Sequence, residues 1–238
     1  MPKELKDFPK YEYKGGVVYQ GDCLEIMPLI KSQSIDLVLT DPPYGIRIGG
    51  SGRIGGSGRT SGPGIFYPTQ YEAVTWDDRP LSAEQFFELR RVSKEQIIFG
   101  FNNFMNILPP SRNIIVWDKK CKNDWEDNFS DCELAWVSKD GLPRVFRHLW
   151  MGALRASEKE SGNRRHPTQK PVVLMKWIVE KYSKQGFTIL DPFMGSGTTG
   201  VACAELHRNF IGIEISEKYF NIAKRRIESV NKTFNFIW

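Results

Sequence analysis

The sequence lacks any apolar stretch long enough to cross a membrane. Its longest largely apolar runs, such as Ile35–Leu39 and Phe210–Ile213, are far shorter than the roughly 18 residues of a membrane-spanning helix. The polar N-terminus, Met1–Lys10, has no apolar core of the kind found in a secretory signal peptide. We therefore expect a soluble, intracellular protein of the cytoplasm that has no membrane partner.

Cysteine and histidine are also scarce, with four cysteines and three histidines in 238 residues. The cysteines form no C-x-x-C pair, and the histidines do not join them at the spacing of metal ligands. The pattern predicts reduced, mostly structural thiols and no metal site. The residues concerned are Cys23, Cys121, Cys132, Cys203, His148, His166 and His207.

The positive charge is concentrated in two segments. The formal net charge is +5, but residues 45–64 carry +3 and residues 138–170 carry +5, so the rest of the chain sums to −3. Such clustering is typical of a face that binds a polyanion, although each basic residue could also belong to a solvated surface. The candidate nucleic-acid contacts are Arg47, Arg53, Arg59, Arg144, Arg147, Arg155, Arg164 and Arg165.

Expected strands alternate with expected helices along one domain, residues 1–238. This alternation predicts a doubly wound α/β fold with a mostly parallel, seven-stranded sheet. The expected strands are Gly16–Gln20, Ile35–Thr40, Gln96–Phe101, Asn113–Asp118, Cys132–Ser138, Phe187–Asp191 and Asn209–Glu214. The expected helices are Leu24–Ile30, Ser82–Val92, Pro171–Ser183, Gly197–Leu206 and Ser216–Val230.

Two segments interrupt the alternation, and we expect both to be insertions. Residues 45–80 begin with a glycine-rich repeat over 45–64, whose composition predicts a mobile loop. Residues 141–165 are basic, contain Trp150 and Met151, and show no long hydrophobic period.

The expected strand Ile35–Thr40 ends in the sequence D-P-P-Y, Asp41 to Tyr44. The two prolines fix φ and remove backbone donors, so a carboxylate and rigid carbonyl acceptors stand at the carboxyl end of the strand. An isolated D-P-P triplet is equally typical of an acidic turn closed by prolines. A second motif is needed to favour chemistry over a turn.

That second motif is the strand and glycine turn D-P-F-M-G-S-G-T-T-G, Asp191 to Gly200. Gly195 and Gly197 allow a ligand to approach the backbone, and the following helix start offers free N–H groups. The segment also contains G-x-G-x-x-G, and Glu214 ends the next expected strand 19 residues after Gly195. On these glycines alone, a nicotinamide-dependent dehydrogenase stays open.

The two motifs together resemble the beta group of DNA amino-methyltransferases. In that group (D/N/S)-P-P-(Y/F) precedes F-x-G-x-G, as Asp41 here precedes Asp191 by 150 positions. The resemblance covers Val17 to Ile227 and disfavours the dehydrogenase. It implies a circularly permuted, Rossmann-like methyltransferase sheet, S-adenosylmethionine as cofactor and double-stranded DNA as substrate.

The resemblance also implies roles for individual residues. The catalytic set is Asp41, Pro42, Pro43 and Tyr44. The segment H-P-T-Q-K-P from His166 would lie beside the methionine end of the cofactor, although it is also typical of a helix entry. Asp22 would meet the adenine amino group or serve as an N-cap, and Glu214 would take the ribose hydroxyls. The cofactor-binding set is Asp22, Cys23, His166, Thr168, Lys170, Asp191, Phe193, Gly195, Ser196, Gly197, Thr198, Thr199 and Glu214.

The expected reaction is direct methyl transfer to an exocyclic amine. The lone pair of such an amine is delocalised into the ring, and the Asp41 carboxylate with the Pro42 carbonyl could bind both N–H groups and aim that lone pair. Tyr44 would stack on the base after it is flipped out of the duplex. No cysteine follows a proline, which disfavours the covalent route to ring-carbon methylation of cytosine.

Asp41 at the first motif position favours adenine N6, and the nearest alternative is cytosine N4, where the family usually has S-P-P-Y. RNA or protein N-methylation and a non-catalytic DNA-binding module are further alternatives. The resemblance implies that residues 141–165 are a short target-recognition segment, which leaves help from a second copy open. A restriction endonuclease partner is open as well.

Overall fold

The computed structural model describes residues 3–45, 79–121, 130–151, 154–158 and 169–235. Its main feature is a nine-stranded sheet in the order β1-β2-β11-β10-β3-β4-β6-β5-β7. The strands are β1 (Lys10–Tyr13), β2 (Gly16–Gln20), β3 (Ile35–Thr40), β4 (Ser93–Phe99), β5 (Ile114–Asp118), β6 (Cys132–Val137), β7 (Arg144–Arg147), β10 (Thr188–Asp191) and β11 (Asn209–Glu214). A separate hairpin pairs β8 (Trp150–Met151) with β9 (Leu154–Arg155).

The predicted α/β class and mostly parallel sheet are confirmed, because five of the eight strand pairings are parallel. The strand count is two higher than expected. Both extra strands, β1 and β7, lie at the sheet edges and are rich in charged or polar side chains, which an edge tolerates. The expectation that all of residues 141–165 is inserted outside the sheet is therefore wrong for Arg144–Arg147, which pair with β5.

Two strands from the C-terminal part of the chain lie between strands from the N-terminal part. β10 pairs in parallel with β3, and β11 pairs in parallel with β2. In parallel neighbours, all carboxyl ends lie at the same edge of the sheet. The topology therefore brings the end of β3 beside the end of β10, although they are far apart in sequence.

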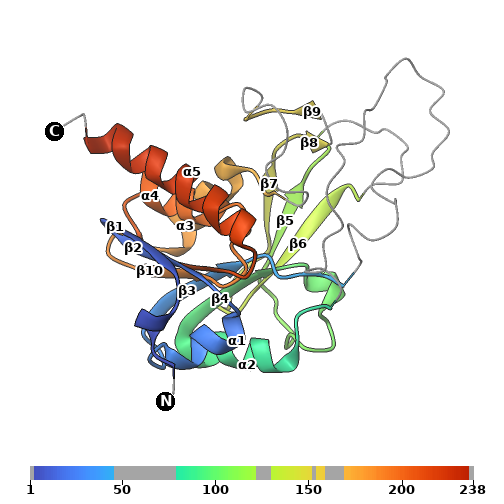
Figure 1. The fold of residues 1–238 in the computed structure, drawn as a ribbon. Helices are drawn as coiled ribbons and strands as arrows, with labels where there is room; N and C mark the ends of the chain where they lie inside the picture. The colour runs from blue at the N-terminus through green and yellow to red at the C-terminus, as the bar shows by residue number, and fades with distance from the viewer. Residues whose placement is uncertain (1–2, 46–78, 122–129, 152–153, 159–168, 236–238) are drawn as a thin grey trace.

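Helices cover both faces of the sheet (Figure 1). On one face, α3, α4 and α5 pack with a core cluster that includes Ile178, Val201 and Phe220. On the other face, α1 and α2 pack with a second cluster that includes Ile26 and Leu89. The helices are α1 (Cys23–Ile26), α2 (Ala83–Val92), α3 (Val172–Tyr182), α4 (Thr198–Glu205) and α5 (Glu217–Asn235), with short 3-10 turns η1 (Leu5–Asp7), η2 (Met27–Leu29) and η3 (Phe101–Asn103).

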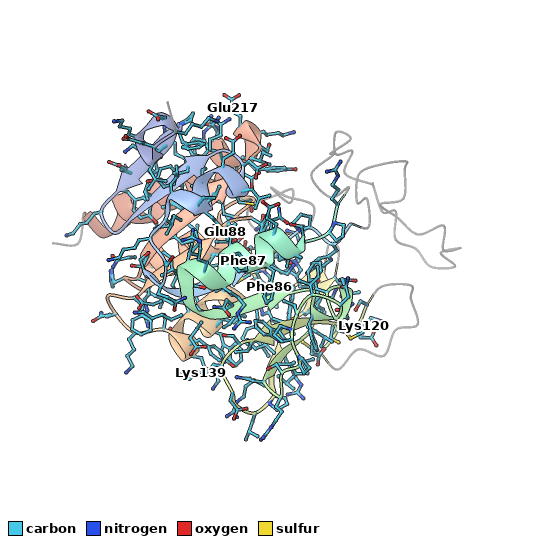
Figure 2. All side chains as sticks on the ribbon, turned by 90° about the horizontal axis from the view of Figure 1, so that it is seen from below. Phe86, Phe87, Glu88, Lys120, Lys139 and Glu217 are labelled. Carbon is cyan, nitrogen blue, oxygen red and sulfur yellow. The ribbon has the colours of Figure 1, made fainter. Side chains whose placement is uncertain are left out.

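Helix α2 shows how local sequence fixes an element beside the site. Ser82 and Gln85 form a reciprocal capping box at its start. Phe86 is buried against the sheet while Phe87 is 67% exposed, and Figure 2 labels both on this helix. The helix is thus amphipathic, with its apolar face toward the core.

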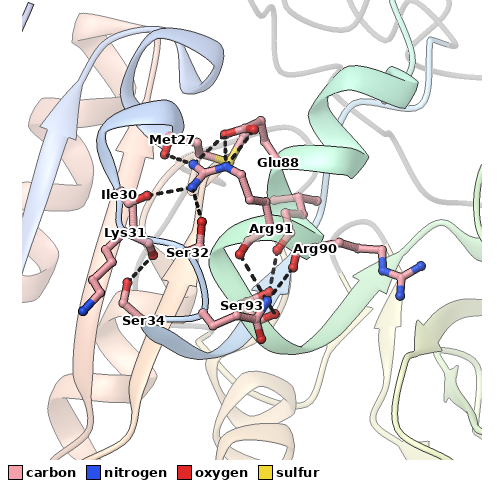
Figure 3. Close-up of polar contacts among 11 residues, drawn as sticks. Met27, Ile30, Lys31, Ser32, Ser34, Glu88, Arg90, Arg91 and Ser93 are labelled. Carbon is pink, nitrogen blue, oxygen red and sulfur yellow. Dashed lines mark hydrogen bonds and ion pairs between the residues drawn. The ribbon is translucent and has the colours of Figure 1, made fainter.

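Arg91 ties the end of α2 to the connection between α1 and β3. Its guanidinium donates to the carbonyls of Ile30 at 3.0 Å and Met27 at 2.7 Å, and it pairs with Glu88 (Figure 3). The hydrogen bond and the charge of Glu88 raise the pKa of Arg91, so the group stays charged. This arrangement holds the chain that leads into β3, the strand that Asp41 follows. Within the described helices, none has the length and apolarity needed to cross a membrane.

Candidate active site

The two Asp-Pro segments meet at the carboxyl edge of the sheet. Leu37 of β3 is in register with Ile189 of β10, and Val38 is in register with Leu190. Asp41, which follows β3, and Asp191, the last residue of β10, therefore lie at the carboxyl ends of two adjacent parallel strands. A cavity of about 560 Å³ opens at this edge. Its volume is in the range of roughly 300–1,000 Å³ that is usual for sites of small ligands.

Most residues that the sequence predicted for the site line this cavity. Its wall includes Asp22, Cys23, Asp41, Pro43, Lys170, Asp191, Phe193, Gly195, Ser196, Thr198, Thr199 and Glu214. Within the described part of the chain, Pro42, Tyr44 and Gly197 belong to the same segments but are not on that wall. His166 and Thr168 lie outside the described residues.

Asp41 is held by two partners of different kinds. The Tyr44 hydroxyl donates to Asp41 Oδ1 at 2.5 Å, and the Lys170 ammonium donates to Asp41 Oδ2. Burial raises the pKa of the Asp41 carboxyl above its ordinary value, and the attraction of Lys170 opposes this rise only in part. Each carboxylate oxygen retains a second acceptor position, so the side chain can still accept hydrogen bonds from a ligand.

The sequence predicted Lys170 as a cofactor-binding residue. In the structure it lines the cavity and also forms an ion pair with Asp41 of the predicted catalytic set. It is buried, at 5% exposure, and also pairs with Glu133 Oε2 at 3.1 Å. Burial alone would lower the pKa of Lys170, but the attraction of Asp41 and Glu133 is stronger and raises it. Lys170 is therefore a charged group between two carboxylates.

The ring of Tyr44 packs within the protein. It meets the Phe104 ring edge-on at 5.8 Å, and it lies over Gly100, whose φ is +81°. A Cβ at position 100 would come within 2.4 Å of Tyr44 Cε1, so this position needs glycine both for its backbone and for the ring. The stacking of Tyr44 on a flipped base stays a prediction.

The glycine turn between β10 and α4 is bound to Glu214. The Gly195 N–H donates to Glu214 Oε2 and the Ser216 N–H donates to Glu214 Oε1, each at 2.8 Å. Gly197 has φ of +77° and leaves no room for a side chain, because an added Cβ would lie 2.7 Å from Ala223 Cβ. Burial raises the pKa of Glu214 to about 7.

Asp191 is satisfied entirely from within the protein. It is 4% exposed and accepts from the Thr40 hydroxyl at 2.7 Å, the Thr199 hydroxyl at 2.6 Å and the Phe193 N–H at 3.2 Å. Burial raises the pKa of Asp191 to about 6. These contacts link β10 to β3 and to the start of α4.

Asp22 and Cys23 line the same cavity. The Asp22 side chain accepts from the Leu24 N–H at 2.8 Å, so it is an N-cap of α1, and it also lines the cavity. The Cys23 thiol is buried, which raises its pKa to about 12. A thiol with this pKa is a packing group and not a thiolate nucleophile.

Two charged residues at the site were missed by the sequence reasoning, Glu133 and Arg226. Arg226 is 7% exposed, and its Nη1 donates to Ser196 O at 2.8 Å, Ser196 Oγ at 3.0 Å and Thr198 Oγ1 at 3.1 Å. The sequence signal that could have identified them is a charged residue within an otherwise apolar segment, which is a strand for Glu133 and a helix face for Arg226. Glu133 precedes Leu-Ala-Trp-Val in β6, and Arg226 follows Ala223 on the buried face of α5.

Three of the predicted DNA contacts are described. Arg144 and Arg147 are exposed on β7, and the Arg155 guanidinium lies 5.1 Å over the Trp150 ring. Arg47, Arg53, Arg59, Arg164 and Arg165 lie outside the described residues. In the part of the chain that the structure describes, there is no group of three or more His, Cys, Asp or Glu side chains that could hold a metal ion.

Comparisons with known proteins identify relatives over most of the chain. A family model for N6/N4 methyltransferases, described as DNA methylase, matches residues 35–225. The Type II methyltransferase M2.LlaDCHI of Lactococcus lactis subsp. cremoris is 28% identical over 92% of this chain and 91% of its own. The Type II methyltransferase M2.DpnII of Streptococcus pneumoniae is 28% identical over 94% of each chain.

Solved structures give the same fold. The crystal structure of the M1.HpyAVI–SAM complex has a TM-score of 0.57 and 25% identity, covering 89% of this chain and 98% of that protein. The PvuII DNA methyltransferase, which is cytosine-N4-specific, has a TM-score of 0.59 and 17% identity, covering 96% and 95%. At that identity the PvuII likeness concerns the fold alone.

Proposed function

The chain belongs to the N6/N4 DNA methylase family, and on that premise we propose that it methylates adenine N6 at specific sites in duplex DNA. The observation that carries the proposal is Asp41, a hydrogen-bonded carboxylate on the wall of a cavity that the glycine turn also lines. A nucleophilic amine bound at Asp41 would face a methyl donor bound at the turn. DNA is the substrate class of the family.

The methyl donor is S-adenosylmethionine, the ligand of the M1.HpyAVI complex. When bound, it supplies an electrophilic methyl group. The residues present fit it: the cavity has the required size, the turn offers backbone at Gly195 and Ser196, and the Glu214 carboxylate has acceptor positions left for hydroxyls. Asp22 would accept from the adenine amino group, and Phe193 would pack beside the cofactor.

At the base, Asp41 and the Pro42 carbonyl would accept both N–H groups of the amine. This localises the lone pair on nitrogen and fixes its direction. The Tyr44 hydroxyl and the Lys170 ammonium orient the carboxylate before the base arrives. After transfer the nitrogen carries a proton in excess, and the partly buried Asp41 carboxylate, with its raised pKa, is the nearest acceptor for it.

Adenine is favoured over cytosine because position 41 is aspartate. The named relatives are Type II methyltransferases, so we also propose a place in a restriction–modification system with an endonuclease partner. Duplex DNA would contact the face that carries Arg144, Arg147 and Arg155, and the base would be flipped into the cavity. A second copy could extend the short recognition segment, residues 141–165.

The proposal is tested by incubating the protein with mixed-sequence duplex DNA and methyl-deuterated S-adenosylmethionine, followed by mass spectrometry of the nucleosides. We expect labelled N6-methyladenosine, and none when cofactor is omitted. Labelled N4-methylcytosine would overturn the assignment of the base. Absence of labelled DNA despite cofactor binding would overturn DNA methylation, and the same assay on RNA and protein would then be run.

A further inference from the structure

Four buried or half-buried charges of alternating sign run from the site into the sheet. Asp41 pairs with Lys170, Lys170 pairs with Glu133 Oε2 at 3.1 Å, and Glu133 Oε1 pairs with Lys119 at 3.1 Å. Their side-chain exposures are 18%, 5%, 25% and 14%. The four residues come from separate segments, since Asp41 follows β3, Lys119 follows β5, Glu133 lies in β6 and Lys170 precedes α3.

We propose that Glu133 is a positioning residue for methyl transfer, which shares the Lys170 ammonium with Asp41 and so sets the orientation and charge state of Asp41. This inference rests on the proposed function and adds to it a residue that never touches the substrate. Glu133 acts through Lys170, and Lys119 holds Glu133 from its other side.

The surroundings of Lys170 explain why a second carboxylate is needed. The ammonium lies 5.3 Å from the centre of the Phe99 ring and 5.8 Å from that of Tyr44; the ring faces attract its charge but offer no hydrogen-bond acceptor in place of water. A buried ammonium needs charged or strongly polar partners. If Asp41 were the only anionic partner of Lys170, the ammonium would interact more strongly with the Asp41 carboxylate. That carboxylate would then be a weaker acceptor for the amine of the base.

Glu133 changes this balance in two ways. It shares the charge of the ammonium through an ion pair at 3.1 Å, which leaves Asp41 a stronger acceptor for the N–H groups of the base. Its negative charge also disfavours the ionised form of Asp41 and so contributes to the raised pKa of that carboxyl. The groups that act on Asp41 are thus the charges of Lys170 and Glu133 and the neutral hydroxyl of Tyr44, with Asp191 nearby.

The test compares wild type with Glu133→Gln, which keeps the shape and removes the charge. We expect kcat to fall by about 10- to 100-fold while the Kd for S-adenosylmethionine changes by no more than about twofold. Because the repulsion from Glu133 is lost, the acid limb of the kcat–pH profile should move to lower pH. Lys170→Met should move that limb in the opposite direction, and Glu133→Asp should recover part of the lost kcat.

The matched control is Glu95→Gln on the neighbouring strand β4. Glu95 is also half-buried, but its partner is the Ser138 hydroxyl at 2.9 Å and not a charged group of the site. Its kcat and pH profile should match wild type. Equal kcat and profile in Glu133→Gln and wild type would overturn the inference, as would a loss of cofactor binding in proportion to kcat.

A readout without activity separates this inference from the proposed function. Carboxyl ¹³C NMR, with Asp41 assigned from Asp41→Asn, should show Asp41 titrating at lower pH in Glu133→Gln than in wild type. If this shift occurs but wild type methylates no DNA, the charge network stands and the proposed function fails. If wild type methylates DNA and Asp41 titrates identically in both, the inference fails. Should Glu133→Gln not fold, Glu133→Asp is measured in its place, with a smaller shift expected.

Discussion

The ends of β3 and β10 carry the same dipeptide, Asp-Pro, on neighbouring parallel strands. Asp191 at the end of β10 is 4% exposed and accepts three hydrogen bonds from neutral donors of the protein. Asp41 at the end of β3 is 18% exposed, lines the cavity, and has a charged partner in Lys170. One carboxylate closes the junction between strands, and the other faces the site.

The difference shows that the dipeptide does not decide the role of the aspartate. The deciding contacts come from distant segments: Thr40 and Thr199 surround Asp191, whereas Lys170 reaches Asp41 from the start of α3. A carboxylate with fixed neutral donors is a structural group, and one with an unfilled acceptor position beside a cavity can bind a ligand. Substitutions at the two ends should therefore separate activity from stability.

The largest effect is expected at the β3 end, from Asp41→Ala. Removing the acceptor that aims the amine should lower kcat for DNA methylation by about 10²- to 10³-fold, the scale for loss of one pre-organised polar group at a reacting centre. The Kd for S-adenosylmethionine should change little, because the glycine turn and Glu214 are intact. Methylation rates under saturating cofactor, together with calorimetric cofactor titration, give both quantities.

Asp36→Ala is the matched control, on the same strand. Its side chain is also 18% exposed and pairs with a lysine, Lys94, but at the opposite end of β3 from the cavity. Its kcat should stay within about threefold of wild type. Equal losses of activity in the two variants would contradict a special role for the β3 end.

At the β10 end, Asp191→Asn should alter the pH dependence of stability. The folded-state pKa of Asp191 is raised from 3.8 to about 6 by burial, so its contribution is present at low pH and is lost as pH rises through about 6. The advantage of wild type over Asp191→Asn in free energy of unfolding should therefore fall by about 2 kcal/mol between about pH 4 and pH 7. Urea unfolding of both proteins across this range measures it.

Glu214, whose pKa is raised to about 7, titrates in both proteins, and because burial is the main cause of that rise and the charge of Asp191 a smaller one, most of its contribution cancels in the difference. A pH-independent difference would show that Asp191 ionises normally in the folded protein, and the contrast between the two strand ends would then rest on exposure alone.

The fold was largely predictable because hydrophobic patterns report burial. All seven expected strands exist, and the five expected helices begin within two residues of their predicted starts. The edge strands β1 and β7 were missed because each is only four residues long, contains two charged residues and has no buried residue. Their pairing is set by the neighbouring strands β2 and β5, which local sequence does not encode.

The site was predictable where a motif is continuous and not where it is assembled from distant residues. D-P-P-Y and the glycine turn are single segments, and the structure brings both to one cavity. Glu133 and Arg226 reach the site only through the packing of β6 and α5. Lys170 was placed by its motif, but its pairing with Asp41 depends on tertiary structure.

The smallest effect is expected from a substitution beside the turn that follows β10. It should weaken cofactor binding and leave the rate of the chemical step nearly unchanged. Arg226 makes three hydrogen bonds to Ser196 and Thr198, which line the cavity, so Arg226→Met should leave the turn less ordered. We expect the Kd for S-adenosylmethionine to rise by about 10-fold, as for about 1.4 kcal/mol of lost interaction, with kcat at saturating cofactor within about threefold of wild type. Arg225→Met, on the exposed side of the same helix turn, is the control and should bind cofactor as wild type does. A fall in kcat without a change in Kd would mean that the turn after β10, like the end of β3, acts on the reacting atoms, and the division between the two strand ends would no longer hold.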